Sequence, residues 1–231
     1  VGLPDILRGR LQRGRPYIER TLSLYDIREH EHLAFLYGHD PAVAAYSQLP
    51  IGLWAEGYPD RAREMCARCI DFAREKNHPP SLAMAYALVP ITYHLLREPE
   101  SVLRVGGEIF SLSQQFDVPL WHHLGSIICA SASGEIEKLG QLIEASESSG
   151  QNFFGSFYTM LLAHLIGKTR SVEEGLDALD RAQAKMEKSD ERIIEPEIHR
   201  MRGELLVKKS GGGRSDSGDT TVEECFRHSL D

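Results

Sequence analysis

The sequence predicts an all-α fold, a right-handed solenoid of about five to six helical hairpins with a period near 40 residues. Segments rich in Ala, Leu, Glu and Arg are interrupted every 15–20 residues by Gly, Pro, Asn or Asp, which is typical of helices separated by turns. Few stretches alternate apolar and polar residues, so no strand is expected. The third observation is an internal repeat, which indicates stacked units of one kind.

The repeat is clearest between two segments forty residues apart. AYSQLPI, residues 45–51, aligns with AYALVPI, residues 85–91, and both hold a proline at the same place. Outside this window, Pro59 aligns with Pro99 and Pro79 with Pro119. Each unit is therefore a helix, a short turn, a second helix and a connector. A single pair cannot bury its apolar faces, so neighbouring units must stack.

The expected helices follow from the breaks. Asp40 before Pro41 is a start signal, and Ser171 with Glu174 forms a capping box. Residues 15–26 resemble the second helix of an earlier unit, and 210–219, rich in Gly and Ser, is expected to be a flexible loop. The hairpins should pair 40–57 with 59–76, 80–97 with 99–116, 119–132 with 135–148, 151–167 with 171–188, and 191–209 with 221–230. We expect residues 1–231 to be a single repeat domain, a fragment of a larger multidomain protein.

Charge and composition narrow the class of protein. The net charge is −8, with 34 acidic against 26 basic residues, which argues against a general nucleic-acid or anionic-membrane surface. No apolar run approaches the roughly 18 residues of a membrane span, and the N-terminal stretch has no apolar core of a signal peptide. Four cysteines without an export signal favour the cytoplasm. The expected partners therefore exclude nucleic acid and membrane.

Cys66 and Cys69 form a C-x-x-C pair, which can bind zinc, perform redox chemistry or simply pack. Both lie on one face of a predicted second helix. Forty residues later their equivalents are Gly106 and Ile109, and in the fourth unit Leu179 and Ala182 stand there. Because small or apolar residues occupy every copy, we expect packing. No second pair follows at finger-like spacing, so zinc and redox chemistry are the weaker alternatives.

The unit, with Gly57 at its turn, Ala62 five residues later and Cys69 beyond, resembles the tetratricopeptide repeat. The stretches LYGHDPAVAAY, LWAEGYPDRA, VEEGLDALDRAQAKMEKSDER and EPEIHRMRGELL are similar to the C-terminal repeat region of bacterial adenylate/guanylate cyclase-like or AAA-ATPase-containing signalling and transcriptional regulators. The likeness covers nearly all of 15–230 and weakens at CASASGEIEKLGQL. The resemblance implies that this chain is a sensing or docking arm. The cyclase or ATPase chemistry of such proteins belongs to other domains.

Other constellations have ordinary explanations. Gly167-Lys168-Thr169 resembles the end of a phosphate loop, but Leu162 stands where that motif needs glycine. The adjacent His122 and His123 point about 100° apart on a helix, which disfavours joint metal ligation. Glu195 and His199 are one turn apart and make an ordinary i,i+4 pair. We therefore predict no catalytic residue, no metal site and no cofactor, and hence no enzyme in this chain.

A partner-binding surface remains as the functional prediction. In such solenoids the first helices line the concave face, and aromatic residues and arginine often anchor partners. Four residues on predicted first helices are the candidates: Trp54, His94, His164 and Arg200. Tyr46 and Tyr86 are expected in the core. The function expected is a non-catalytic interaction or regulatory module, whose partner is a protein, a peptide or another domain of the same parent chain. The alternative is a sensor that binds a small molecule in the groove.

Overall fold

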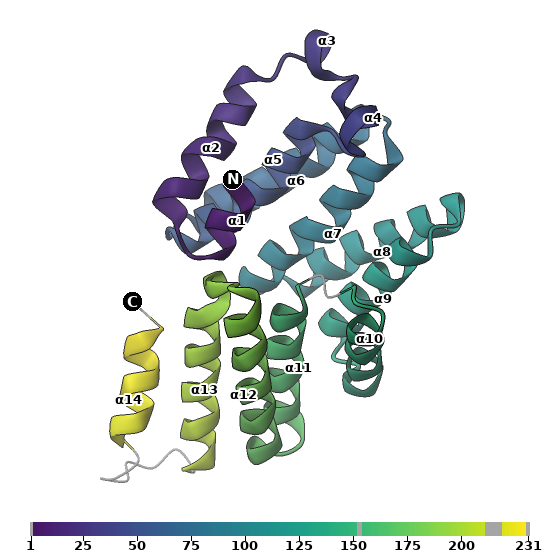
Figure 1. The fold of residues 1–231 in the computed structure, drawn as a ribbon. Coiled ribbons are helices and arrows are strands. Elements are labelled where there is room, and N and C mark those ends of the chain that lie inside the picture. The colour runs from purple at the N-terminus through teal and green to yellow at the C-terminus, as the bar shows by residue number, and fades with distance from the viewer. Residues whose placement is uncertain (1, 152–153, 211–218, 230–231) are drawn as a thin grey trace. The chain divides into compact units, whose positions relative to one another are not determined.

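The computed structural model describes residues 2–151, 154–210 and 219–229, and these residues form helices and turns without any strand. The all-α prediction is confirmed. Contacts divide the chain into two compact units, unit 1 (Val1–Ser133) and unit 2 (Gly134–Asp231). Each unit is a series of helices that pack on their neighbours in the chain (Figure 1).

Unit 1 contains nine helices within its described residues. Both complete hairpins predicted there are confirmed to within a few residues, and the predicted second helix at 15–26 is α2. The short helices α1, α3 and α4 were not predicted. The bounds are α1 (Gly2–Leu7), α2 (Leu11–Leu24), α3 (Ile27–His30), α4 (Leu33–Tyr37), α5 (Pro41–Ala55), α6 (Pro59–Glu75), α7 (Pro79–Leu95), α8 (Pro99–Phe116) and α9 (Pro119–Ser133).

Proline marks the start of each helix from α5 to α9. The fixed φ of proline suits the first helical turn, and proline loses nothing there by lacking an N–H, because backbone N–H groups in that turn have no partner within the helix. Asp40 caps α5 as predicted, because its Oδ1 accepts from the backbone N–H groups of Ala42 (2.8 Å) and Val43 (3.1 Å). Pro50 and Pro90 both lie inside their helices, α5 and α7. The first helices therefore tolerate an internal proline at the same repeat position.

The turns repeat with the same spacing as the sequence. Gly57 and Arg97, forty residues apart, both have positive φ, 83° and 61°. Asn77 and Asp117, also forty apart, do the same at 48° and 52°. A residue in the left-handed conformation ends a helix, because it turns the chain so that the next backbone N–H groups donate to the last free carbonyls of the helix. Hairpins α5–α6 and α7–α8 are thus two copies of one backbone design.

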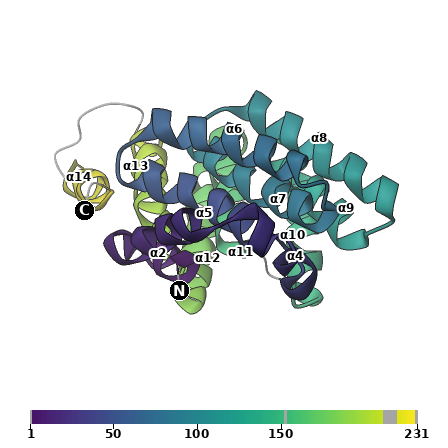
Figure 2. The ribbon, with the colours of Figure 1, turned by 90° about the horizontal axis from the view of Figure 1, so that it is seen from above.

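The helices of unit 1 lie in layers. Seen from above, α6 and α8 run along one side and α5, α7 and α9 along the other, with α2 outside α5 (Figure 2). Positions that the repeat predicts to be packing positions are buried: Cys66 and Cys69 in α6, and Gly106 and Ile109 in α8. The second helices bury one face, whereas α5 and α7 are apolar nearly all round and bury most of their residues.

Unit 2 is built from α10 (Ile136–Ser148), α11 (Gly155–Thr169), α12 (Val172–Ser189), a 3₁₀ turn η1 (Arg192–Ile194), α13 (Glu195–Lys209) and α14 (Asp219–His228). Helices α11 to α14 lie side by side in chain order (Figure 1). The boundary between the units falls between α9 and α10, the two helices that the sequence pairs as its third hairpin. Most of the loop predicted at 210–219, residues 211–218, lies outside the described residues.

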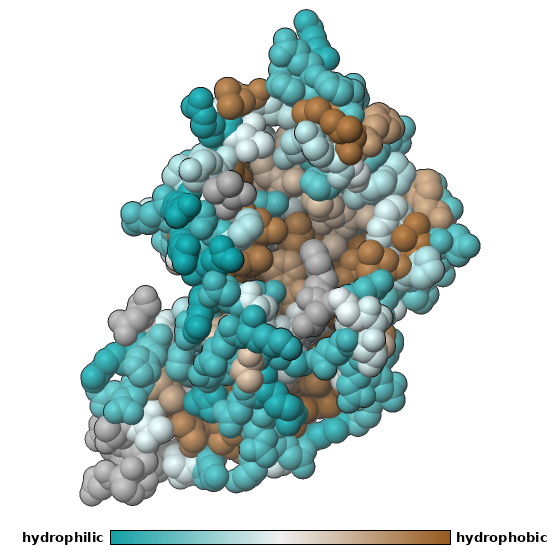
Figure 3. Space-filling model, viewed as in Figure 1, coloured by the Kyte–Doolittle hydropathy of each residue, from teal (hydrophilic) through white to brown (hydrophobic). Residues whose placement is uncertain are grey.

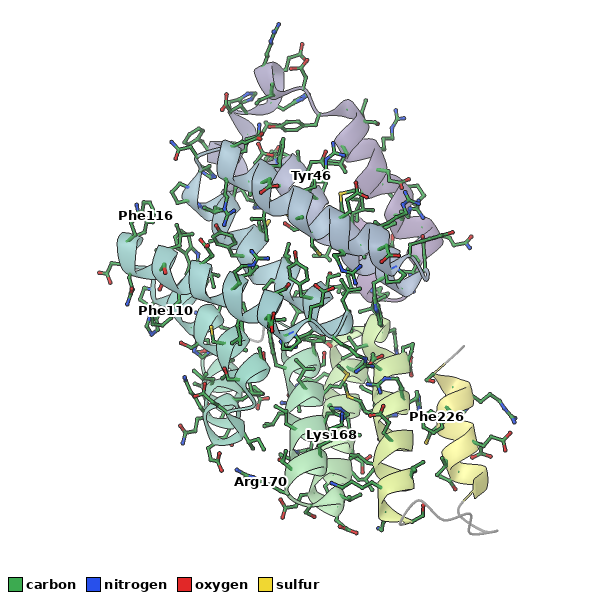
Figure 4. All side chains as sticks on the ribbon, turned by 180° about the vertical axis from the view of Figure 1, so that it is seen from behind. Tyr46, Phe110, Phe116, Lys168, Arg170 and Phe226 are labelled. Atoms are coloured by element: carbon green, nitrogen blue, oxygen red, sulfur yellow. The ribbon has the colours of Figure 1, made fainter. Side chains whose placement is uncertain are left out.

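Glycines set the close contacts of unit 2. A Cβ built on Gly175 of α12 would lie 2.4 Å from the Cα of Gly167 in α11, so these two helices touch through their backbones. A Cβ on Gly203 of α13 would meet the ring of Phe226, 2.9 Å away. Figure 4 shows Phe226 pointing from α14 towards α13. The last hairpin, α13–α14, is therefore closed by an aromatic ring seated on a glycine.

Across the described residues, none of the helices combines the length and the apolar character that crossing a bilayer demands.

Candidate functional site

The four predicted partner-binding residues all lie on first helices, as expected. Trp54 is on α5 and His94 on α7 in unit 1, and His164 is on α11 and Arg200 on α13 in unit 2. All four are partly buried rather than fully exposed. The contacts of each side chain decide what it can offer to a partner.

His94 links two first helices. Its Nε2 lies 2.8 Å from the hydroxyl of Ser131 on α9, and that hydroxyl donates to the carbonyl of Ile128. Burial lowers the pKa of His94 to about 4, because removing water disfavours the charged imidazolium. His94 is therefore neutral at physiological pH, and the hydrogen bond holds α7 against α9.

His164 and Arg200 belong to one polar cluster. The Arg200 guanidinium donates from Nε (3.0 Å) and Nη2 (2.8 Å) to the Glu197 carboxylate. It also donates from Nη1 to Glu204, whose other oxygen lies 3.9 Å from the Nε2 of His164. The cluster brings two predicted residues together across α11 and α13, and two glutamates compensate the charge of Arg200.

Trp54 lies at the end of α5, where its carbonyl accepts the N–H of Gly57 at 3.0 Å. The carbonyl of His94 accepts the N–H of Arg97 in the equivalent turn, also at 3.0 Å. The predicted repeat equivalence of Trp54 and His94 is thus confirmed in the backbone. Of the predicted tyrosines, Tyr86 is buried as expected. Tyr46 (labelled in Figure 4) is half-buried, and the Arg68 guanidinium lies over its ring at 5.1 Å.

The cysteine pair packs in the core. Cys66 and Cys69 are fully buried free thiols in α6, and the Cys69 sulfur lies 3.3 Å from the hydroxyl of Ser47. Burial raises the pKa of Cys69 to about 12 and raises that of Cys66 as well. A nucleophilic or metal-binding cysteine acts as the thiolate, which these surroundings oppose. The packing prediction is confirmed.

The Gly167-Lys168-Thr169 stretch is the end of α11 and not a phosphate loop. Lys208 Nζ donates to the carbonyls of Gly167 (3.1 Å) and Lys168 (2.7 Å), the usual use of a cation at a helix C-terminus. Lys168 and Arg170 lie at this end of α11 in Figure 4. Phosphate binding needs backbone N–H groups, whereas this end presents carbonyls. Gly167 is needed for its contact with Gly175.

Two further histidines lie beside other rings in tilted arrangements. The His122 ring lies 4.5 Å from that of Phe110, and the His199 ring lies 5.3 Å from that of His228. Burial, and then the neighbouring His228, lower the pKa of His199. In the part of the chain that the structure describes, no three His, Cys, Asp or Glu side chains gather as a metal site.

A buried ionic cluster in unit 1 was not predicted. Lys76 and Asp40 have side chains only 3% and 1% exposed, with Nζ and Oδ2 3.7 Å apart. The hydroxyl of Tyr25 lies between them, 2.6 Å from Asp40 Oδ2 and 2.7 Å from Lys76 Nζ. The Lys76 ammonium also lies 4.8 Å from the centres of the Tyr25 and Phe72 rings. Burial, and then the hydrogen bond to Asp40, raise the pKa of Tyr25.

This cluster closes the base of residues 26–39, a connecting segment that holds the short helices α3 and α4 and that we call loop 26–39. Tyr25 precedes the loop and Asp40 follows it, so their hydrogen bond joins its two ends. The backbone N–H of Asp40 also donates to the hydroxyl of Ser81 on α7, at 2.7 Å. Compact loops with close ends are frequently functional. The corresponding signal in the sequence is Tyr25, fifteen residues before the capping residue Asp40. A separation of fifteen residues does not by itself indicate that two side chains are in contact.

The loop presents three consecutive apolar side chains, which we call the α4 tip. Phe35 is 80% exposed, Leu36 68% and Tyr37 62%. Folded proteins normally avoid such runs unless they serve a contact. In Figure 3 apolar surface gathers over α4. The sequence signal was the run LAFLY, which is too short to distinguish a buried from an exposed turn of helix.

Beside the tip is a concave region of about 470 Å³, the α2–α5 hollow. It lies between α2, α4 and α5, and Figure 3 looks into it, over an apolar floor. Tyr37 belongs to both the tip and the hollow, and Tyr17, 51% exposed, lines it from α2. The other lining residues are Gly2, Ile18, Thr21, His39, Pro41, Ala44, Ala45 and Gln48.

Comparison of the chain with models of protein families, with curated proteins and with solved structures finds no match in any of the three.

Proposed function

We propose that this chain is a non-catalytic module that binds another protein, and that the partner docks in unit 1 on the α4 tip and the α2–α5 hollow. The observation that carries the proposal is the exposure of Phe35, Leu36 and Tyr37 on a loop with a closed base. An exposed apolar surface costs solubility, and it is typical of an interaction site. The closed base reduces the entropy lost on binding, because the loop is already ordered.

The resemblance gives this module its setting. As a tetratricopeptide-like, right-handed array of hairpins near 40 residues each, it would act as the regulatory arm of a bacterial signalling protein in the cytoplasm. Its partner would be another domain of the same parent chain or a separate protein, with cyclase or ATPase chemistry outside this chain. The buried thiols of Cys66 and Cys69 weigh against nucleophilic or metal chemistry at this pair, since their surroundings oppose the thiolate.

Trp54, near the C-terminal end of α5 and outside the lining of the hollow, stays a separate candidate contact. His94, His164 and Arg200 are engaged inside the protein, so their replacement would disturb packing as well as any interface. A binding test that uses them needs a separate check of folding. The α4 tip avoids that difficulty, because its side chains are mostly in solvent.

The test is calorimetric titration of the chain against the other domains of its reading frame. Leu36→Ala with Tyr37→Ala should weaken binding about thirtyfold, since truncated anchors typically cost at least about 2 kcal/mol. Leu103→Ala, at an exposed leucine of α8, is the matched control and should bind like the wild type. Trp54→Ala tests the other candidate contact, at the end of α5. Unchanged affinity in the folded tip variant would remove the α4 tip from the interface.

A small-molecule sensor is the second candidate, favoured by the hollow itself. Its volume lies within the roughly 300–1,000 Å³ of ligand sites, and Thr21, His39 and Gln48 add polar groups to an apolar lining. A panel of nucleotides and metabolites would then raise the melting temperature of the wild type but not of Tyr17→Ala. If no compound produces such a shift, the protein-binding proposal stands alone.

A further inference from the structure

The α4 tip and the α2–α5 hollow form a projection and a recess on one face of unit 1. Phe35 and Leu36 are mostly exposed, with the centre of the Phe35 ring 5.3 Å from that of the His78 ring, and the hollow begins at Tyr37, the next residue. A surface that holds both shapes can pair with a copy of itself, because in a two-fold contact each copy offers its projection to the recess of the other. The geometry is therefore self-complementary in shape.

The two segments that border the hollow carry opposite net charge, while the residues that line it include no Asp, Glu, Lys or Arg. Residues 2–24, which form α1 and α2, carry five arginines against Asp5 and Glu19, a net charge of +3. Loop 26–39 carries Asp26, Glu29 and Glu31 against Arg28, a net charge of −2 with neutral imidazoles. A two-fold contact that seats the tip of one copy in the hollow of the other brings the acidic loop to the basic α2. Opposite charges in such a contact fix its register.

The exposed apolar area is sufficient for a modest interface. Taking roughly 200 Å² for each fully exposed side chain, the exposures of Tyr17, Phe35, Leu36 and Tyr37 amount to about 500 Å² in each copy. Two copies would bury about 1,000 Å², the lower limit for a specific protein contact. The acidic loop opposes an anionic lipid surface, which is the other place where exposed aromatic and leucine side chains bind.

We propose that the partner of this surface is a second copy of the chain, paired about a two-fold axis with each α4 tip in the other's α2–α5 hollow. The inference rests on the proposed function, since it names the occupant of the same surface. The ordered loop base, held by Tyr25, Asp40 and Lys76, presents the tip in one arrangement to the second copy.

Sedimentation equilibrium of the chain between about 1 and 200 μM tests the pairing, with a micromolar dissociation constant expected for this area. Phe35→Ser with Leu36→Ser should weaken association about thirtyfold or more. The control, Leu103→Ser with Val207→Ser, replaces exposed apolar residues of α8 and α13 and should associate like the wild type. Circular dichroism confirms that every variant is folded.

A charge exchange tests the two-fold register. Arg20, on the basic α2, and Glu29, in the acidic loop 26–39, are both exposed. Arg20→Glu and Glu29→Arg should each weaken self-association, because like charges then meet twice in each pair. An equimolar mixture of the two variants should associate again, because both contacts become opposite in sign. A mixture that stays as weak as its components would overturn this arrangement.

Two further outcomes would overturn the pairing itself. A wild type that remains monomeric to about 200 μM, or a tip variant that associates as strongly as the control, removes the second copy from this surface. Co-sedimentation of monomeric wild type with phosphatidylcholine vesicles, lost in the tip variant, would assign the tip to lipid. A monomer whose titration against the parent's other domains depends on the tip would keep the proposed function and end only the self-pairing.

Discussion

Gly106 and Gly107 are neighbours in α8, yet alanine should change stability in opposite directions at the two positions. A Cβ on Gly106 would lie 2.8 Å from both the Cys129 sulfur and the Ile128 Cγ2 of α9. Ordinary contacts begin near 3.4 Å, so these two side chains, or the backbone of α9 that carries them, must move by more than half an ångström. A Cβ on Gly107 meets nothing within 4 Å, because that position faces solvent.

The expected magnitudes follow from packing and helix propensity. Overpacking costs about 1–3 kcal/mol, and replacing a helical glycine by alanine gains up to about 1 kcal/mol. Gly106→Ala should therefore lower the free energy of unfolding by about 1–2 kcal/mol. Gly107→Ala has only the propensity term and should raise it by about 0.5–1 kcal/mol. The two variants should differ by about 1.5–3 kcal/mol.

Urea unfolding followed by circular dichroism measures the difference, read on the transition that contains unit 1. The slope with denaturant should stay constant, so that the shift in midpoint reports stability. The reasoning fails if Gly106→Ala is as stable as Gly107→Ala. Such a result would mean that α8 and α9 do not approach each other through Gly106, and that the repeat position shared with Cys66 is not a packing position there.

Three further predictions concern buried groups. The pKa of His94 is lowered to about 4 in the folded protein, against about 6.5 in the unfolded chain. Folding therefore favours the neutral imidazole, and its contribution to stability is complete above pH 6.5 and is lost as the pH falls towards 4. By pH 5 the free energy of unfolding should be lower by about 2 kcal/mol. Urea unfolding at pH 7 and 5 should show a smaller loss for His94→Gln, and an equal loss would contradict the assignment. Cys66→Ala with Cys69→Ala should keep the helical spectrum at a cost of about 1–2 kcal/mol; stoichiometric zinc, with unfolding by a chelator, would refute the packing role. Lys76→Met should cost about 3–5 kcal/mol, and adding Asp40→Asn should recover part of it, because the single change leaves a buried carboxylate without its cation. A loss below about 1 kcal/mol for Lys76→Met would show that water reaches the pair.

Much of the fold follows from local signals in the sequence. The helices from α5 to α13 begin and end within a few residues of their expected positions, because Pro, Gly and capping residues act within one turn of the chain. The forty-residue repeat identified Cys66 and Cys69 as packing residues, since Gly106 and Ile109 occupy the same environment. When one position recurs along the chain, the residue types found in its copies indicate whether that position packs or faces solvent.

The candidate surface depended on the tertiary structure. His94 reads as a groove residue, but its neutral state and its bond to Ser131 exist only once α7 and α9 pack together. Loop 26–39 falls outside the repeat, so periodicity says nothing about it. Its exposed tip follows from the contact of Tyr25, Asp40 and Lys76, which are up to 51 residues apart in sequence. Such contacts come from packing between elements, and no local rule of sequence encodes which distant side chains will meet.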